Sequence, residues 1–294
     1  MRFFTLTLAV LLLSCSASNN ATSKLEKKQT LLGTWDLVSY VDHEESKTEW
    51  QEYPQHILYQ KHVTGTHFTW IRYNKEKDQL EGMGGGNYHF RDGKYVENIE
   101  YFYPPGAGIL GQSIPFEAKV KNDQWQHTGY IREMELDFEE AAMVQGDSVK
   151  IEEIWVRSSA SEASNQQLAG TWDLKLYRDN PEESYYEYPE LTGYLKLITD
   201  THFVWIKYDQ EGDQIYGAGC GTYDFNGEQY TENIQMFYPS GSTLLGTSIT
   251  FNAEINDYQW KHLGYGEGED AKILIDEVWI SHVNTIEEEV AVSF

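Results

Sequence analysis

Apolar and polar residues alternate with period two in several segments, which is the pattern of a strand that turns one face toward a core. The clearest such segment spans residues 113–121. Its apolar face carries Ile114, Phe116, Ala118 and Val120. Turn signals such as Asp92-Gly93 and Asn122-Asp123 separate consecutive segments, and the sequence has no convincing helical period of 3.6. The pattern predicts an all-β chain of consecutive antiparallel strands.

The strand pattern occurs twice along the chain. The segment 33–37 (Gly-Thr-Trp-Asp-Leu) returns as 170–174, and residues 66–73 return as 201–208. The repeat distance of roughly 135 residues is far longer than a solenoid unit, so it indicates two domains of one fold. The first copy holds about 11 extra residues near its end, and we expect the acidic stretch 133–140 to extend a hairpin there.

The N-terminus has the features of a secretory signal, because Arg2 precedes an apolar run that is too short to span a bilayer. The run ends in Leu12-Leu13-Ser14-Cys15, which resembles the lipoprotein box of bacterial lipoproteins. That resemblance implies cleavage before Cys15 and lipid modification of its thiol. The residue after the cysteine is Ser16 and not Asp, which in lipoproteins of Gram-negative bacteria indicates the outer membrane. We therefore expect an outer-membrane lipoprotein of a Gram-negative bacterium. An ordinary cleaved signal is the alternative.

The net charge of the chain excludes some classes of binding partner. Asp and Glu number 47 and Lys and Arg number 22, which gives a formal net charge of −25. This excess argues against nucleic acid, whose phosphates need basic residues, and against electrostatic docking on anionic lipid. We therefore expect membrane contact through the lipid on Cys15 alone. Cys220 is then the single remaining cysteine, and we interpret it as a small apolar filler in a Gly-rich turn.

Both copies open with Gly-Thr-Trp and close with Glu-x-Trp, and the first closes as Glu153-Ile154-Trp155-Val156-Arg157. These motifs resemble the lipocalin-like (calycin) families of bacterial secreted proteins. The resemblance implies two tandem antiparallel β-barrels, with Arg157 of the last strand packed over Trp35 of the first. In the second copy Ser281 stands where the Arg would be. A β-sandwich is the alternative fold.

The chain divides accordingly into six segments. They are a signal peptide (1–14), the lipidated cysteine and a flexible tether (15–30), a first barrel (31–158), a linker (159–167), a second barrel (168–283) and an acidic tail (284–294).

Alternation also places polar side chains on the apolar faces of several strands. Glu97 shares a face with Tyr95 and Ile99, and its repeat Glu232 does the same. The expected ligand-binding set, with two His and two Glu aimed into each aromatic interior, is His67, Glu97, Trp125, His127, Glu153, His202, Glu232, Trp260, His262 and Glu277.

This set has three interpretations. Buried carboxylates need hydrogen-bond donors, so the set is a structural network in the first interpretation. In the second, a mostly apolar pocket uses these few polar groups to orient a small molecule. In the third, His and Glu move protons or hold a metal. The His residues come from distant strands without a close-spaced ligand motif, so we predict no metal and name no catalytic residue. Binding is favoured over catalysis, and the cofactor question stays open.

Two further features of the sequence are a glycine run and two aromatic runs. Gly82-Met83-Gly84-Gly85-Gly86 has no helix start after it to cradle a phosphate, so we expect a hairpin connection. Aromatic runs at 185–188 and 101–103 suggest a surface glycan-binding protein as an alternative function. The prediction is a lipid-anchored envelope protein that binds a small, partly apolar molecule inside its barrels, with the oligomeric state open.

Overall fold

The computed structural model describes residues 30–43, 48–105, 108–137, 142–163, 165–209, 214–256, 258–267 and 272–282. The predicted signal peptide, Cys15, nearly all of the tether and the acidic tail lie outside these residues.

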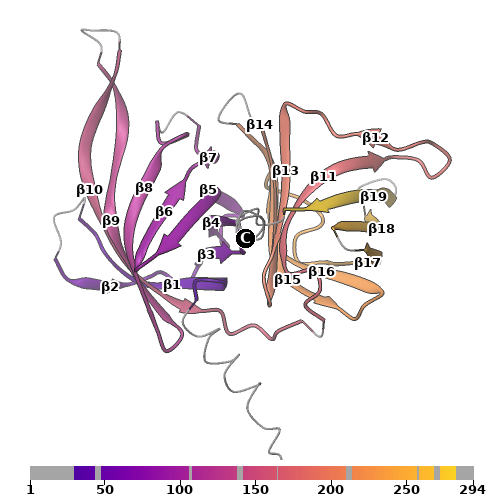
Figure 1. Ribbon diagram of the computed structural model, residues 1–294, viewed down its shortest axis with the longest axis horizontal. Helices are drawn as coiled ribbons and strands as arrows, with labels where there is room; N and C mark the ends of the chain where they lie inside the picture. Colours follow the sequence, from indigo (N-terminus) through magenta and orange to yellow (C-terminus); the bar gives the residue numbers. More distant parts are fainter. Residues whose placement is uncertain are drawn as a thin grey trace, which may run out of the picture.

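The first half of the described chain forms one barrel, here called barrel 1 (Figure 1). Its strands are β1 (Gly33–Val41), β3 (Ile57–Val63), β4 (His67–Asn74), β5 (Gln79–Arg91), β6 (Lys94–Asn98), β8 (Ser113–Lys121), β9 (Gln124–Asp137) and β10 (Ala142–Arg157). The short strands β2 (Trp50–Glu52) and β7 (Tyr101–Tyr103) pair with β1 and β5.

The second half forms barrel 2 in the same way. Its strands are β11 (Gly170–Arg178), β13 (Thr192–Ile198), β14 (His202–Asp209), β15 (Ile215–Phe225), β16 (Gln229–Tyr238), β17 (Ser248–Asn256), β18 (Gln259–Glu267) and β19 (Lys272–Ser281). The short strand β12 (Tyr186–Glu187) pairs with β11.

Both sheets close on themselves. Each strand pairs antiparallel with its sequence neighbour in the barrel, and the last strand returns to the first through β1–β10 and β11–β19. Within the described residues, eight strands close each barrel, which leaves no long open edge. The predicted all-β fold of two tandem antiparallel barrels is confirmed, and the sandwich alternative is wrong. No helix in the described part of the chain is long and apolar enough to cross a membrane.

The start of β1 shows why the Gly-x-Trp motif forms this structure. Gly33 has φ +120°, and a Cβ there would lie 2.7 Å from Nη1 of Arg157. The Arg157 guanidinium lies 4.2 Å from the ring centroid of Trp35, as the resemblance implied. Trp35 donates its indole N–H to the Leu31 carbonyl at 2.7 Å. In barrel 2, Ser281 lies opposite Trp172 where Arg157 lies opposite Trp35.

Three buried tryptophans fill the centre of each barrel. Trp35 and Trp125 meet edge to face with ring centroids 5.6 Å apart, and their repeats Trp172 and Trp260 meet at the same distance. The third is Trp155 in barrel 1 and Trp279 in barrel 2, both fully buried. Burying an aromatic side chain of this size contributes up to roughly 4–6 kcal/mol, so these rings dominate the cores.

The glycine run 82–86 is not a hairpin connection, which corrects the prediction. It lies inside β5, where it pairs with β4. A Cβ on Gly84 would come within 3.0 Å of the Trp70 and Phe102 rings. The glycines therefore leave room for aromatic rings from neighbouring strands, a role that the turn signal in the sequence does not reveal. Cys220 is likewise fully buried within β15 and not in a turn.

The extra residues of the first copy lengthen one hairpin. Strand β9 has 14 residues and β10 has 16, against 9 and 10 in their counterparts β18 and β19. Their pairing continues to Ala142 opposite Asp137. The hairpin stands out beyond the other strands of barrel 1 (Figure 1).

The two barrels pack side by side through the outer faces of β3–β5 and β13–β16 (Figure 1). A buried apolar cluster joins them and includes Ile71, Met83, Tyr101, Leu197, Ile206 and Cys220. Thr34 contacts Thr199 (Oγ1–Oγ1 2.8 Å), and Thr64 contacts Thr171 (2.6 Å). Exchanging the two copies exchanges these pairs, so the contact surface, here called the seam, is self-complementary like that of a two-fold dimer.

Candidate ligand cavity

Barrel 2 contains a cavity of about 200 Å³ that is partly open to solvent. Its polar lining residues include Lys196, Glu232 and His262, which are buried, and Glu277, which is partly buried. The remaining wall is apolar and largely aromatic, with Tyr194, Trp205, Phe237 and Leu244 among its members. The side chains of these apolar-wall residues, Tyr194, Trp205, Phe237 and Leu244, are only partly buried, so the apolar end of the cavity lies toward solvent.

Lys196 and Glu232 form a buried ion pair at the polar end. The Lys196 ammonium lies 2.8 Å from Glu232 Oε1, and the side chains are 4% and 5% exposed. The Tyr230 hydroxyl donates to the same oxygen at 2.9 Å. The ammonium also lies 4.9 Å from the Trp279 ring centroid, within cation–π range. A paired and hydrogen-bonded charge avoids much of the large penalty of isolated burial.

His262 and Glu277 form the second polar pair. They lie directly opposite one another on β18 and β19, where cross-strand side chains meet. His262 Nε2 lies 2.6 Å from Glu277 Oε2, and the Trp279 indole donates to that same oxygen at 3.2 Å. Both hydrogen bonds use Oε2, so neither occupies Oε1 of Glu277, which is one of the residues that line the cavity.

The electrostatics fix the proton positions in this pair. Burial and the charge of Lys196 lower the pKa of His262, and its hydrogen bond to Glu277 only partly offsets them. Burial raises the pKa of Glu277, but the hydrogen bond from His262 and the charge of Lys196 bring it below its usual value. At neutral pH the pair is therefore a neutral imidazole and a carboxylate. Since a carboxylate only accepts, Nε2 carries the proton and Nδ1 is a bare acceptor.

That bare nitrogen has no hydrogen-bond partner among the described residues. The His262 side chain is 1% exposed, so bulk solvent does not serve it. A buried polar atom without a partner is unusual in a native fold and indicates an unseen water, ion or ligand.

Barrel 1 repeats the arrangement. Lys61 pairs with Glu97 at 2.7 Å. His127 Nδ1 lies 2.9 Å from Glu153 Oε2, which also accepts from the Trp155 indole at 2.9 Å. The other His127 ring nitrogen, Nε2, lacks a partner among the described residues. Both barrels thus carry one Lys–Glu pair and one His–Glu–Trp group inside.

Eight of the ten predicted site residues lie inside the barrels. They are Glu97, Trp125, His127 and Glu153 in barrel 1, and Glu232, Trp260, His262 and Glu277 in barrel 2. Of these, Trp260 is in the core of barrel 2 without lining the cavity.

His67 and His202 do not point into the barrels, which corrects the expected face. Strands β4 and β14 are apolar on both sides, so alternation alone could not assign their faces. The outer side of each packs against the other barrel, and it carries these histidines together with Ile71 and Ile206. His67 lies beside His282, with ring centroids 4.7 Å apart, and His202 lies beside His62 at 5.8 Å.

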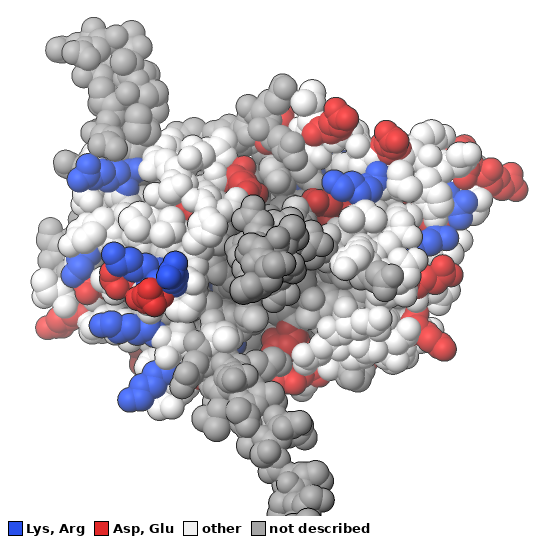
Figure 2. All heavy atoms as spheres, viewed as in Figure 1, with Lys and Arg blue, Asp and Glu red and all other residues white. Residues whose placement is uncertain are grey.

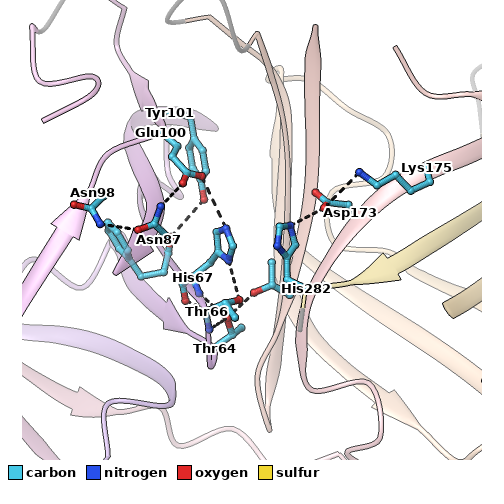
Figure 3. A network of polar contacts seen from close by, with 12 residues as sticks. Thr64, Thr66, His67, Asn87, Asn98, Glu100, Tyr101, Asp173, Lys175 and His282 are labelled. Atoms are coloured by element: carbon cyan, nitrogen blue, oxygen red, sulfur yellow. Dashed lines mark hydrogen bonds and ion pairs between the residues drawn. The ribbon is translucent and has the colours of Figure 1, made fainter. Parts of the chain in front are cut away.

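The seam histidines are part of a polar network between the barrels (Figure 3). His282 lies 2.6 Å from Asp173, and His67 Nδ1 lies 2.8 Å from the Thr66 hydroxyl. Burial and the neighbouring His282 lower the pKa of His67 to about 4, and burial lowers that of His202 to about 4. These histidines are neutral partners in an interface and not ligand groups of the cavity.

The buried lysines were missed by the sequence reasoning. Lys61 and Lys196 lie on strands whose outer faces are also buried, so their segments do not alternate cleanly. The internal repeat held the signal, because Tyr59-Gln60-Lys61 returns as Tyr194-Leu195-Lys196. Among the described residues no group of three or more His, Cys, Asp or Glu side chains could hold a metal ion.

The aromatic runs suggested for glycans are mostly not exposed. Tyr101 is 1% exposed in the seam, and Tyr103 packs on Tyr238 with ring centroids 5.5 Å apart. Tyr185 donates its hydroxyl to Asp276, and only Tyr186 of the other run is strongly exposed, at 48%. A sugar platform of several stacked aromatics is therefore not formed by these two described runs.

No protein-family model matches the sequence, and no curated protein matches it. The solved structures that are similar to the chain include three that cover most of it. An uncharacterized protein from Saccharomyces cerevisiae has 11% identity and a TM-score of 0.40, with 85% of this chain and 98% of that chain covered. A protein of unknown function from the DUF3598 family of Nostoc punctiforme has 10% identity and a TM-score of 0.23, with 86% and 96% covered. Transferrin Binding Protein B from Haemophilus parasuis has 8% identity and a TM-score of 0.23, with 85% and 74% covered. At these values we infer no ligand or activity from them.

Proposed function

We propose that the protein binds a small, partly apolar molecule in the cavity of barrel 2. The observation that carries this proposal is a cavity whose walls are apolar and aromatic around the polar groups of Lys196, Glu232, His262 and Glu277. One of these residues, His262, has a buried Nδ1 that lacks a partner among the described residues. Pockets for small molecules combine mostly apolar walls with a few placed polar groups, which is the composition of this cavity.

The cavity volume limits the molecule to about one ring. An engineered apolar cavity of about 150 Å³ holds benzene, whereas drug-sized molecules need about 300 Å³ or more. The cavity of about 200 Å³ therefore suits a ring with a short polar substituent.

A structural role explains part of the polar set. Lys196 and Glu232 neutralise one another's charge, and Glu277 accepts two hydrogen bonds at one oxygen. It does not explain the empty acceptor on His262, which favours binding. Proton transfer or metal chemistry gains no further support from the described side chains.

For its cellular place, we propose a lipoprotein that is anchored in the outer membrane of a Gram-negative bacterium through Cys15. The support is the apolar run and the Leu-Leu-Ser-Cys sequence that ends it. Replacing Cys15 by Ser should abolish incorporation of labelled palmitate and release the protein from the membrane fraction. An unchanged membrane fraction without label would contradict the anchor.

Native mass spectrometry of residues 16–294 tests the binding proposal. We expect a mass excess in the native protein that disappears on denaturation and so identifies the ligand. Leu244→Phe, which fills the cavity, should remove the excess, while Leu191→Phe at a 59% exposed position of the same barrel should keep it. Equal native and denatured masses, together with no binding of added single-ring compounds, would contradict the proposal.

A further inference from the structure

We propose that the ligand of the barrel 2 cavity is a small organic cation, an amine carried on a single ring. This inference rests on the proposed function and deepens it by naming the chemical class. Three observations on the cavity point the same way: its hydrogen-bonding groups, its formal charge and its aromatic wall.

The two carboxylates that line the cavity keep acceptor positions. His262 Nδ1 is a bare nitrogen, because Nε2 faces the Glu277 carboxylate at 2.6 Å. Both donors to Glu277 use Oε2, and both donors to Glu232 use Oε1, so each carboxylate keeps one oxygen. A ligand that satisfies them must bring N–H or O–H donors, and an ammonium group brings three.

The formal charges of the lining residues do not balance. The single ammonium of Lys196 faces two carboxylates, Glu232 and Glu277, while His262 is neutral. One negative charge is left over, and in a site of low dielectric an opposite charge on the ligand is favoured. Lys196 does not act against this, since its ammonium is tied to Glu232 and lies over the Trp279 and Trp260 rings.

The wall beside the polar groups is aromatic. Tyr194 lies 5.8 Å from Trp205, and Trp205 lies 5.4 Å from Phe237, measured between ring centroids. The negative faces of such rings attract a cation and their edges pack against an apolar ring. Amine and ring of one ligand therefore both find complementary surfaces.

The charge of the whole barrel supports entry of a cation. Residues 168–283 contain 20 Asp and Glu and 6 Lys and Arg. On the face in Figure 2, acidic side chains are the more numerous over barrel 2, while basic side chains gather over barrel 1. A negative field of this kind raises the local concentration of cations and their association rate.

Three probes of one size test the charge. Benzylamine is the cation, benzyl alcohol is its neutral counterpart and benzoate is the anion, and binding to the protein with both barrels is measured by isothermal titration calorimetry at pH 7.5. We expect benzylamine to bind roughly tenfold to a hundredfold more tightly than benzyl alcohol, because a charged hydrogen bond contributes about 1.5–3 kcal/mol. Benzoate should bind most weakly.

Glu277→Gln tests the site. It keeps the side-chain size and removes the surplus charge, so the preference for benzylamine should fall to roughly twofold or less. Glu254→Gln makes the same change on the outer face of β17 and should keep the full preference. If Glu277→Gln fails to fold, the ranking of the probes on the unchanged protein still decides the charge class.

The outcomes separate the two proposals. Tighter binding of benzylamine that depends on Glu277 supports the cationic ligand. Equal or tighter binding of benzyl alcohol or benzoate overturns the cation and leaves the proposed binding function standing. If none of the three probes binds and no co-purified molecule is found, the binding function itself is overturned and the cation with it.

Discussion

Acid should weaken the protein through the seam histidines before its carboxylates titrate. His67 and His202 have pKa values of about 4 in the folded state, against about 6.5 for an unfolded chain. Among the acidic groups, Glu100 Oε2 lies 3.9 Å from His67 Nε2. The charge of Asp173 acts on His67 and that of Asp200 on His202, but burial outweighs all of these charges and keeps both pKa values low. Protonation in the folded state would put charges into a buried apolar contact.

Proton linkage gives the direction and the size of the change in the free energy of unfolding with pH. A folded pKa below the unfolded one means that the unfolded chain binds more protons between pH 6.5 and 4. Stability is therefore fully present above about pH 6.5 and is lost as the pH falls. At pH 5 each of the two histidines lowers the free energy of unfolding by about 2 kcal/mol, or about 4 kcal/mol together.

Urea denaturation followed by tryptophan fluorescence at pH 7.5 and pH 5 measures this loss. Replacing His67 and His202 by Gln removes the titrating groups, so the double variant should lose about 4 kcal/mol less than the unchanged protein between these pH values. Groups such as His127 and His262 remain in both proteins and cancel in the comparison. An identical pH dependence of the two proteins would refute the placement of neutral histidines in the seam.

Substitutions at Lys61 and Gly33 and the reactivity of the Cys220 thiol test three other features of the structure. Lys61→Met leaves Glu97 buried without its partner and should lower the free energy of unfolding by about 3–5 kcal/mol. Lys61→Met/Glu97→Leu should recover most of it, and a double variant as unstable as the single one would contradict this. Gly33→Ala meets a positive φ and Arg157 and should destabilise by about 2 kcal/mol or more, whereas Gly65→Ala, with open space around its Cβ, should change the urea midpoint little. The Cys220 thiol is buried, which raises its pKa to about 12, so it should react with a disulfide reagent only in urea; fast reaction of the native protein would disprove its burial.

Some of the molecule could be read from local patterns alone. Period-two alternation and the long internal repeat were sufficient for an all-β chain of two similar domains, because a strand with one face in water records its buried face in its own residues. For the same reason Glu97, His127, Glu232 and His262 were correctly placed on inward faces. Closure of each domain into a barrel was implied by the family resemblance, and alternation alone left a sandwich open. The packing of Arg157 over Trp35 was likewise implied by the family resemblance of the Gly-x-Trp motif and not by the local pattern.

The tertiary structure decided what alternation could not. Strands β3, β4, β13 and β14 are largely buried on both sides, by a barrel interior and by the other barrel, so apolar residues occur on both of their faces and alternation carries no face signal. That is why His67 was assigned to an interior and Lys61 and Lys196 were overlooked. The glycines of β5 were ambiguous for a related reason. A side chain there would collide with the rings of Trp70 and Phe102, which come from other strands. The neighbouring residues in the chain determine whether a residue lies in a strand. The residues that it contacts across the seam or in the core determine the role of its side chain.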